Sequence, residues 1–147
     1  MSSDLQVFNE KPNSEEEYFA HIVRSTFVVG FSRKVIDSKW KGFEEVFDKF
    51  NYKSVAMWGA DEIQEASEST KIIRNFKKIN ATVENARQFE KLLKEFGSMH
   101  SYIRSLDGLD HDVRLKKIAD NFNFFGPTAA NIFLYLSGEP VRHIEKK

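Results

Sequence analysis

The 147-residue sequence has no cysteine, no long apolar run and no net charge. Without cysteine the chain cannot form disulfides, thiolate zinc sites or a cysteine nucleophile, which fits an intracellular protein. No apolar run approaches the roughly 20 residues that span a bilayer, so no membrane partner is expected. Residues 1–6 lack the basic-then-apolar pattern of a secretory signal, and the expected location is therefore the cytoplasm.

The overall charge gives no argument for nucleic-acid binding, because 22 basic residues balance 22 acidic ones. The charges are unevenly spread, however. Residues 1–20 and 61–68 are acidic, whereas residues 71–94 and the C-terminal third are basic. A neutral protein can present one basic face to DNA. Charge alone favours an ordinary salt-bridged helical surface.

Core-forming residues are plentiful, with 41% hydrophobic residues and fourteen phenylalanines. This composition and length predict one helical domain over residues 1–147, with a less ordered N-terminal arm over residues 1–13. Neither a metal nor another cofactor is expected.

Two helix starts are marked by serine. Ser14 and Glu17 have the spacing of a capping box, which predicts a helix through residues 18–23. Ser32 precedes a second predicted helix through residues 35–36. Helical spacing of apolar residues then continues through Phe43, Val46, Phe47 and Phe50.

Later segments show the same helical periodicity. A short helix is predicted near residues 61–63, and the clearest long helix covers residues 75–96, with Gly97 as its C-terminal stop. The last third predicts a helix-hairpin-helix unit over residues 113–138, whose second helix runs over residues 128–137. No alternating strand pair is evident, so the sequence predicts an all-α fold.

Gly126, Pro127 and Thr128 stand at the predicted hairpin. A glycine turn followed by a helix N-terminus leaves backbone N–H groups that can bind a phosphate oxygen. Such a hairpin fixes a protein on DNA without reading sequence. A Gly-Pro pair is also a common helix cap, so this motif alone favours the cap.

The run I-I-R-N-F-K-K-I-N-A at residues 72–81, continued by N-A-R at residues 85–87, resembles the DNA-3-methyladenine glycosylase I family. Residues 30–32 resemble the G-L-S turn of that family. Residues 47–56 resemble its F-x-x-F-x-x-x-x-V-A segment, and residues 125–128 resemble its hairpin.

The resemblance covers residues 20–140 and implies an all-helical, helix-hairpin-helix DNA glycosylase fold. Such enzymes flip a damaged nucleotide out of the duplex and cleave its N-glycosidic bond. Phe31 occupies the family's wedge position, where an apolar side chain fills the vacated stack; the alternative is a core aromatic. With the hairpin, Lys77 and Lys78 are predicted to contact phosphates.

The sequence departs from the family at its base pocket. Ser25 stands where the resemblance implies a glutamate, and Arg33 stands where it implies an aromatic that stacks on a cationic base. Both are predicted to line the pocket, and Arg33 suits the O6 and N7 atoms of a neutral purine better than a cation. The family's zinc ligands are also missing. These departures argue against selectivity for 3-methyladenine.

No catalytic residue is identified from the sequence. Asp37 and Asp120 lie near the expected cleft, but spacing does not separate them from helix caps. Glu139 follows the second hairpin helix, where relatives in the wider superfamily place a catalytic Asp, and is expected to be a surface residue.

The sequence therefore predicts a DNA glycosylase-like base-excision repair protein, most simply a monomer, that acts on duplex DNA carrying a damaged or abasic nucleotide. Two alternatives stay open. One is a catalytically inactive, damage-sensing homologue on the same fold. The other is a helical protein-interaction domain, which the neutral charge and acidic N-terminus favour.

Overall fold

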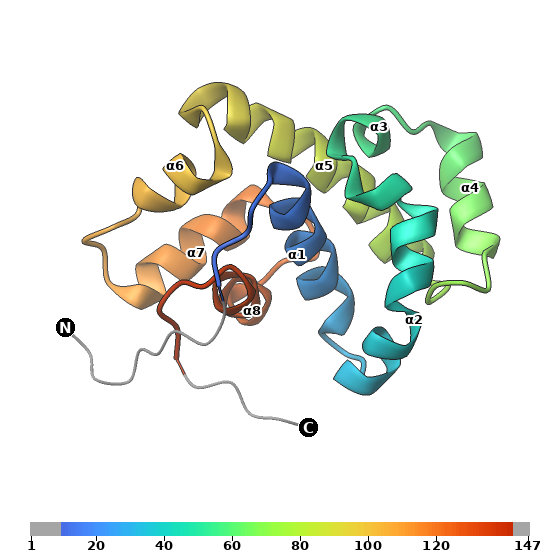
Figure 1. Ribbon diagram of the computed structural model, residues 1–147, viewed down its shortest axis with the longest axis horizontal. Helices are drawn as coiled ribbons and strands as arrows, with labels where there is room; N and C mark the ends of the chain where they lie inside the picture. Colours follow the sequence, from blue (N-terminus) through green and yellow to red (C-terminus); the bar gives the residue numbers. More distant parts are fainter. Residues whose placement is uncertain (1–9, 143–147) are drawn as a thin grey trace.

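The computed structural model describes residues 10–142, which form a bundle of helices (Figure 1). Residues 1–9 of the predicted N-terminal arm lie outside this range. The elements are α1 (Glu15–Val28), α2 (Arg33–Val46), a 3₁₀ turn (Asp48–Phe50), α3 (Tyr52–Ala56), α4 (Ala60–Glu68), α5 (Phe76–Phe96), α6 (Met99–Arg104), α7 (His111–Asn121) and α8 (Pro127–Leu136). Residues 10–142 contain no strand, so the prediction of an all-α fold is confirmed.

Side-chain caps set the starts of the helices, as the sequence predicts. The Ser14 hydroxyl accepts the backbone N–H of Glu17 at 3.1 Å and begins α1. Ser32 begins α2 in the same way. Each cap supplies a partner for an N–H group that the helix itself cannot satisfy. The long helix α5 ends at Gly97, whose φ of +87° suits glycine.

The helical spacing of apolar residues continues to Phe50, but the α-helix does not. Helix α2 ends at Val46, and residues 48–50 turn with positive φ angles of 52°, 56° and 61°. Phe50 still reaches the core, where its ring stacks on Trp40 at a centroid distance of 5.0 Å. The apolar spacing predicted that Phe50 is buried, but it did not predict the path of the backbone. The tight turn over residues 48–50 brings the Phe50 ring to the side of the core that it would reach if α2 continued.

Helix α5 is the central support of the fold. It packs against α1, α3, α4 and α6, while α1 packs in turn against α2 and α8. In Figure 1, α1 lies between the α7–α8 hairpin and the group formed by α2, α3 and α4. Phenylalanines fill these interfaces with edge-to-face contacts, such as Phe19 on Phe89 at 5.6 Å and Phe27 on Phe43 at 4.8 Å.

Two polar side chains of α5 hold neighbouring backbone segments in place. The buried Asn85 side chain accepts the N–H of Asn123 at 2.7 Å and donates to its carbonyl at 3.1 Å, which fixes the loop between α7 and α8. Arg87 donates to the carbonyl oxygens of Ala56 and Trp58, both at 2.8 Å, at the end of α3. Asn85 and Arg87 both belong to the motif that carries the family resemblance.

Within residues 10–142, no helix has both the length and the apolar character needed to cross a membrane.

Candidate functional site

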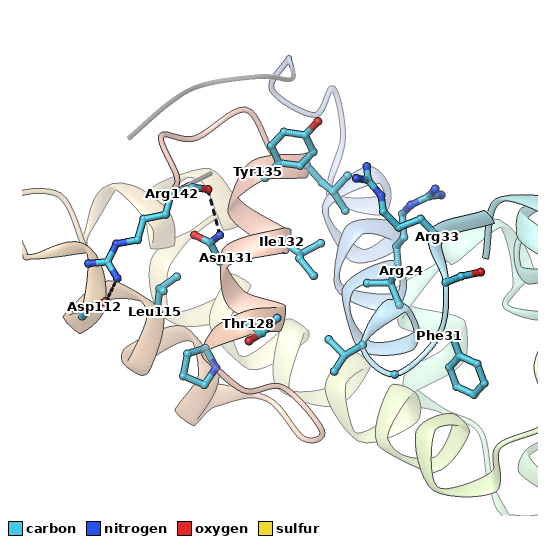
Figure 2. Close-up of a pocket in the computed structure, with 16 residues that line it drawn as sticks. Arg24, Phe31, Arg33, Asp112, Leu115, Thr128, Asn131, Ile132, Tyr135 and Arg142 are labelled. Atoms are coloured by element: carbon cyan, nitrogen blue, oxygen red, sulfur yellow. Dashed lines mark hydrogen bonds and ion pairs between the residues drawn. The ribbon is translucent and has the colours of Figure 1, made fainter. Parts of the chain in front are cut away.

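A cleft of about 880 Å³ separates the α1–α2 turn from the α7–α8 hairpin (Figure 2). One wall is formed by the end of α1 and the start of α2. The other wall is formed by the starts of α7 and α8 and by one face of α8. Pockets of several hundred cubic ångströms are typical of small-molecule sites, so this cleft can hold a nucleotide.

The turn between α1 and α2 presents Phe31 at the rim of the cleft. Gly30 has a φ of +91°, and the Phe31 N–H donates to the Val28 carbonyl at 3.0 Å, which closes the turn. The Phe31 side chain is 39% exposed, whereas Phe27 one turn earlier is fully buried. Phe31 is therefore a rim residue and not a core aromatic. Its role as a wedge stays a prediction.

Lys78 lies beneath this turn and is not available for DNA. Its side chain is buried, and its ammonium group donates to the carbonyl oxygens of Phe27 at 3.3 Å and Val29 at 2.5 Å. The ammonium also lies 4.9 Å from the Phe31 ring centroid. The structure thus contradicts the predicted phosphate contact for Lys78, because its donors serve the C-terminal end of α1. Burial lowers the pKa of Lys78.

The other predicted DNA contacts are exposed. Lys77 is exposed in the first turn of α5, next to the Lys78 that supports Phe31. Gly126, Pro127 and Thr128 are exposed at the start of α8. Gly126 provides no side-chain cap, so the first N–H groups of α8 are open to an anion.

Ser25 does not line the cleft, so its assignment to the base pocket is wrong. The side chain is fully buried on α1, and its hydroxyl donates to the carbonyl of His21 at 2.7 Å. A small side chain that bonds to its own helix cannot reach a base. The serine at position 25 therefore does not take the place of the glutamate that the resemblance implies.

Arg33 does line the cleft, and a second arginine accompanies it. Arg24 projects from α1 on the same wall (Figure 2), forms an ion pair with Asp37 and lies 4.8 Å from the ring centroid of Trp40. Burial lowers the pKa of Arg24, and the positive charge of Arg33 lowers it further. Sequence reasoning missed Arg24. The available signal was a lone cation inside the apolar stretch over residues 22–29.

The carboxylate among the described residues that line this cleft is paired with a cation. Asp112 is the acid among the lining residues, and it pairs with Arg142 at 2.7 Å (Figure 2). Asp37 pairs with Arg24, and Asp120 belongs to an exposed ion pair along α7. Over residues 10–142, the lining therefore offers no unpaired carboxylate to activate water.

Glu139 is buried, which contradicts its expected position at the surface. It is 1% exposed and forms ion pairs with Arg104 and, at 2.9 Å, with Lys11. Burial alone would raise the pKa of this carboxyl, but the hydrogen bonds from Lys11 and Arg104 hold it below its usual value. Glu139 thus joins the N-terminal segment and α6 to the end of α8.

The zinc site that the resemblance implies does not fit this chain. The sequence has no cysteine, and residues 10–142 contain no group of three or more His, Asp or Glu side chains that could hold a metal ion. In this chain the two ends of the described residues are connected by the ion pairs of Glu139 and not by a metal ion.

Comparison with known protein families finds one match over most of the chain. The family described as methyladenine glycosylase matches residues 9–132.

Solved structures of similar fold agree with this match. A variant of 3-methyladenine DNA glycosylase I in complex with 3-methyladenine is 22% identical, with a TM-score of 0.80 over 90% of this chain and 82% of that one. The enzyme of that name from Staphylococcus aureus gives 22% identity and a TM-score of 0.80 over 90% and 81% of the two chains. A further 3-methyladenine DNA glycosylase I gives 19% identity and a TM-score of 0.76 over 89% and 84%. At these identities the structures establish the fold.

Proposed function

Because the chain belongs to the methyladenine glycosylase family, we propose that its cleft receives a damaged nucleotide everted from duplex DNA. The family and fold are those of hydrolytic DNA N-glycosylases, which act in DNA repair. The substrate is therefore DNA. The observation that carries the proposal is the cleft itself, with Phe31 on one wall and an open helix N-terminus on the other.

The exposed groups around the cleft suit the backbone of a kinked duplex. In Figure 2, Phe31 and Thr128 lie toward the same end of the cleft, on opposite walls. We assign the start of α8 to one phosphate and Lys77 to another. Phe31 then enters the stack that the everted nucleotide leaves. Unstacking costs a few kcal/mol, which the inserted ring partly offsets.

The functional unit we propose is a monomer. The proposed substrate is duplex DNA with a damaged or abasic nucleotide, and the proposed location is the cytoplasm.

One observation favours a second candidate function. The unpaired carboxylate that activates water in many glycosidic reactions is missing from the described lining. A damage-sensing protein that binds the lesion without hydrolysis would need no such group. Detection of released base separates the two functions.

Binding to an abasic duplex tests the proposal. We expect the protein to bind a duplex with a tetrahydrofuran abasic site at least about 10-fold more tightly than the undamaged duplex, since the vacated stack accepts Phe31 at lower cost. Phe31→Ala should remove this preference. Gly126→Asp should weaken both complexes by placing a negative charge at the phosphate site.

Met57→Ala is the matched control, because Met57 is an exposed apolar side chain that does not line the cleft. Equal affinity of the wild-type protein for damaged and undamaged duplexes would contradict the proposal, as would an unchanged preference in Phe31→Ala.

A further inference from the structure

We propose that Arg24 and Arg33 make the base pocket selective for neutral bases bearing carbonyl oxygens, such as deaminated or oxidised bases, over cationic alkylated bases. This inference rests on the proposed function, since it requires that the cleft receives an everted base. It concerns the substrate class of this chain, whose pocket has Arg33 in its lining and no glutamate at position 25.

The cleft has an excess of positive charge. Three arginines line it, at positions 24, 33 and 142, against one lining carboxylate, Asp112. Asp112 neutralises Arg142, and Asp37 neutralises Arg24 from outside the lining. No carboxylate of the described residues lies within ion-pair distance of Arg33, which is half-buried at the start of α2.

Acidic residues do occur on the far side of this wall. Arg24 and Arg33 also border a smaller neighbouring pocket, to which Glu16, Glu17 and Glu44 contribute. None of these three glutamates forms an ion pair with either arginine. Among the arginines that line the main cleft, Arg33 is therefore the one that no carboxylate of residues 10–142 neutralises by an ion pair.

A cationic base is disfavoured in such a pocket. Two like charges a few ångströms apart repel one another more strongly near a protein surface than in bulk water. Burial lowers the pKa of Arg24, and the positive charge of Arg33 lowers it further. A third positive charge would add to this repulsion. A base that carries carbonyl oxygens instead accepts hydrogen bonds from guanidinium donors, which bind a purine O6 and N7 in bidentate geometry.

The same arginines can assist the chemical step for a neutral base. When the bond between C1′ and the base nitrogen breaks, its electron pair stays on the base, and the sugar becomes an oxocarbenium ion. The base leaves as an anion, and guanidinium groups stabilise the charge that develops on its carbonyl oxygens. Water adds to C1′ and loses a proton, and the anionic base takes up a proton. The products are the free base and an abasic sugar hydroxyl.

Stabilising the leaving group in this way agrees with a lining that has no unpaired carboxylate among residues 10–142. A cationic alkylated base leaves as a neutral molecule and gains nothing from the arginines.

Base release under single-turnover conditions tests the inference. Duplexes of one sequence would carry uracil, hypoxanthine, xanthine or 8-oxoguanine in one set, and 3-methyladenine or 7-methylguanine in the other. We expect release from at least one duplex of the first set and none above background from the second. Arg33→Met should slow release about 10-fold or more. Lys34→Met, which removes the same charge from an exposed neighbour outside the cleft, should not change it.

Affinity for the tetrahydrofuran duplex, which contains no base, separates this inference from the proposed function. If that affinity is intact but the protein releases only cationic bases, or none, the selectivity is wrong and the proposed function survives. Equal weakening of all duplexes by Arg33→Met, including the tetrahydrofuran duplex, would place Arg33 on a phosphate and also overturn the inference. Loss of lesion preference in the wild-type protein would remove the proposed function itself.

Discussion

Adjacent lysines at the start of α5 have different environments, and we infer different roles for them. The Lys78 ammonium is buried against backbone carbonyls and lies beneath the Phe31 ring, so it positions the rim of the cleft. Lys77, one residue earlier, is exposed. Only Lys77 can therefore neutralise a phosphate directly.

Substitution of the two lysines separates these roles. Lys78→Met leaves the Phe27 and Val29 carbonyls without their charged donor, so we expect a loss of about 1–3 kcal/mol in the free energy of unfolding, measured by urea titration. Lys77→Met should leave stability unchanged. It should reduce the slope of log affinity against log salt by about one, because one phosphate contact is lost. If Lys77→Met lowered the stability and Lys78→Met reduced only the salt dependence, the roles of the two lysines would be exchanged.

The positions of side chains were predictable from the sequence where exposure follows from backbone position. The turn glycine before Phe31 and the start of α2 at Ser32 place Phe31 and Arg33 at the cleft. Ser25 and Lys78 were misassigned because their side chains turn inward to backbone carbonyls. The Lys78 contacts depend on the packing of α1 against α5, which local sequence does not encode, whereas Ser25 bonds within its own helix.

At the scale of elements, the buried carboxylate of Glu139 ties the end of α8 to Lys11 in the N-terminal segment and to Arg104 in α6. This contact spans 128 residues of sequence, so it closes the described chain into one unit. Sequence reasoning missed it because a Gly-Glu-Pro segment after a helix is typical of an exposed end.

Removing the charge of Glu139 tests this role. Glu139→Gln leaves two cations without a buried partner, and we expect a loss of about 2–4 kcal/mol in the free energy of unfolding at neutral pH. Asp120→Asn, which breaks an exposed pair with Lys116 on α7, should cost less than about 0.5 kcal/mol.

The contribution of Glu139 to the free energy of unfolding depends on pH. Its folded pKa lies below the ordinary glutamate value of 4.5, so the stabilisation is present above that value and is lost as the pH falls through the folded pKa. Glu139→Gln should therefore remove part of the acid-induced loss of stability. Equal pH profiles of the wild type and the variant would contradict this account.

Helix boundaries were largely predictable, since Ser14, Ser32 and Gly97 act as stops and starts through local chemistry. The positive φ angles over residues 48–50 were not predictable, because none of these residues is a glycine. Tertiary burial of Phe50 accompanies that conformation.

At the scale of the whole molecule, the residues that maintain the fold are different from the residues that line the pocket. The motif on α5 contacts three neighbouring segments: Lys78 bonds to the turn between α1 and α2, Asn85 to the loop between α7 and α8, and Arg87 to the end of α3. These contacts preserve the cleft and carry the family resemblance. The arginines that line the cleft lie outside this motif, so the fold can persist while the substrate class changes.

The central claim is that this cleft receives a base everted by Phe31. The most direct test is the fluorescence of 2-aminopurine, which stacking quenches, placed at a mismatched position in a duplex. On saturation with the wild-type protein, we predict a several-fold rise in fluorescence, which Phe31→Ala abolishes. A saturated complex whose fluorescence stays at the level of the free duplex would contradict the claim.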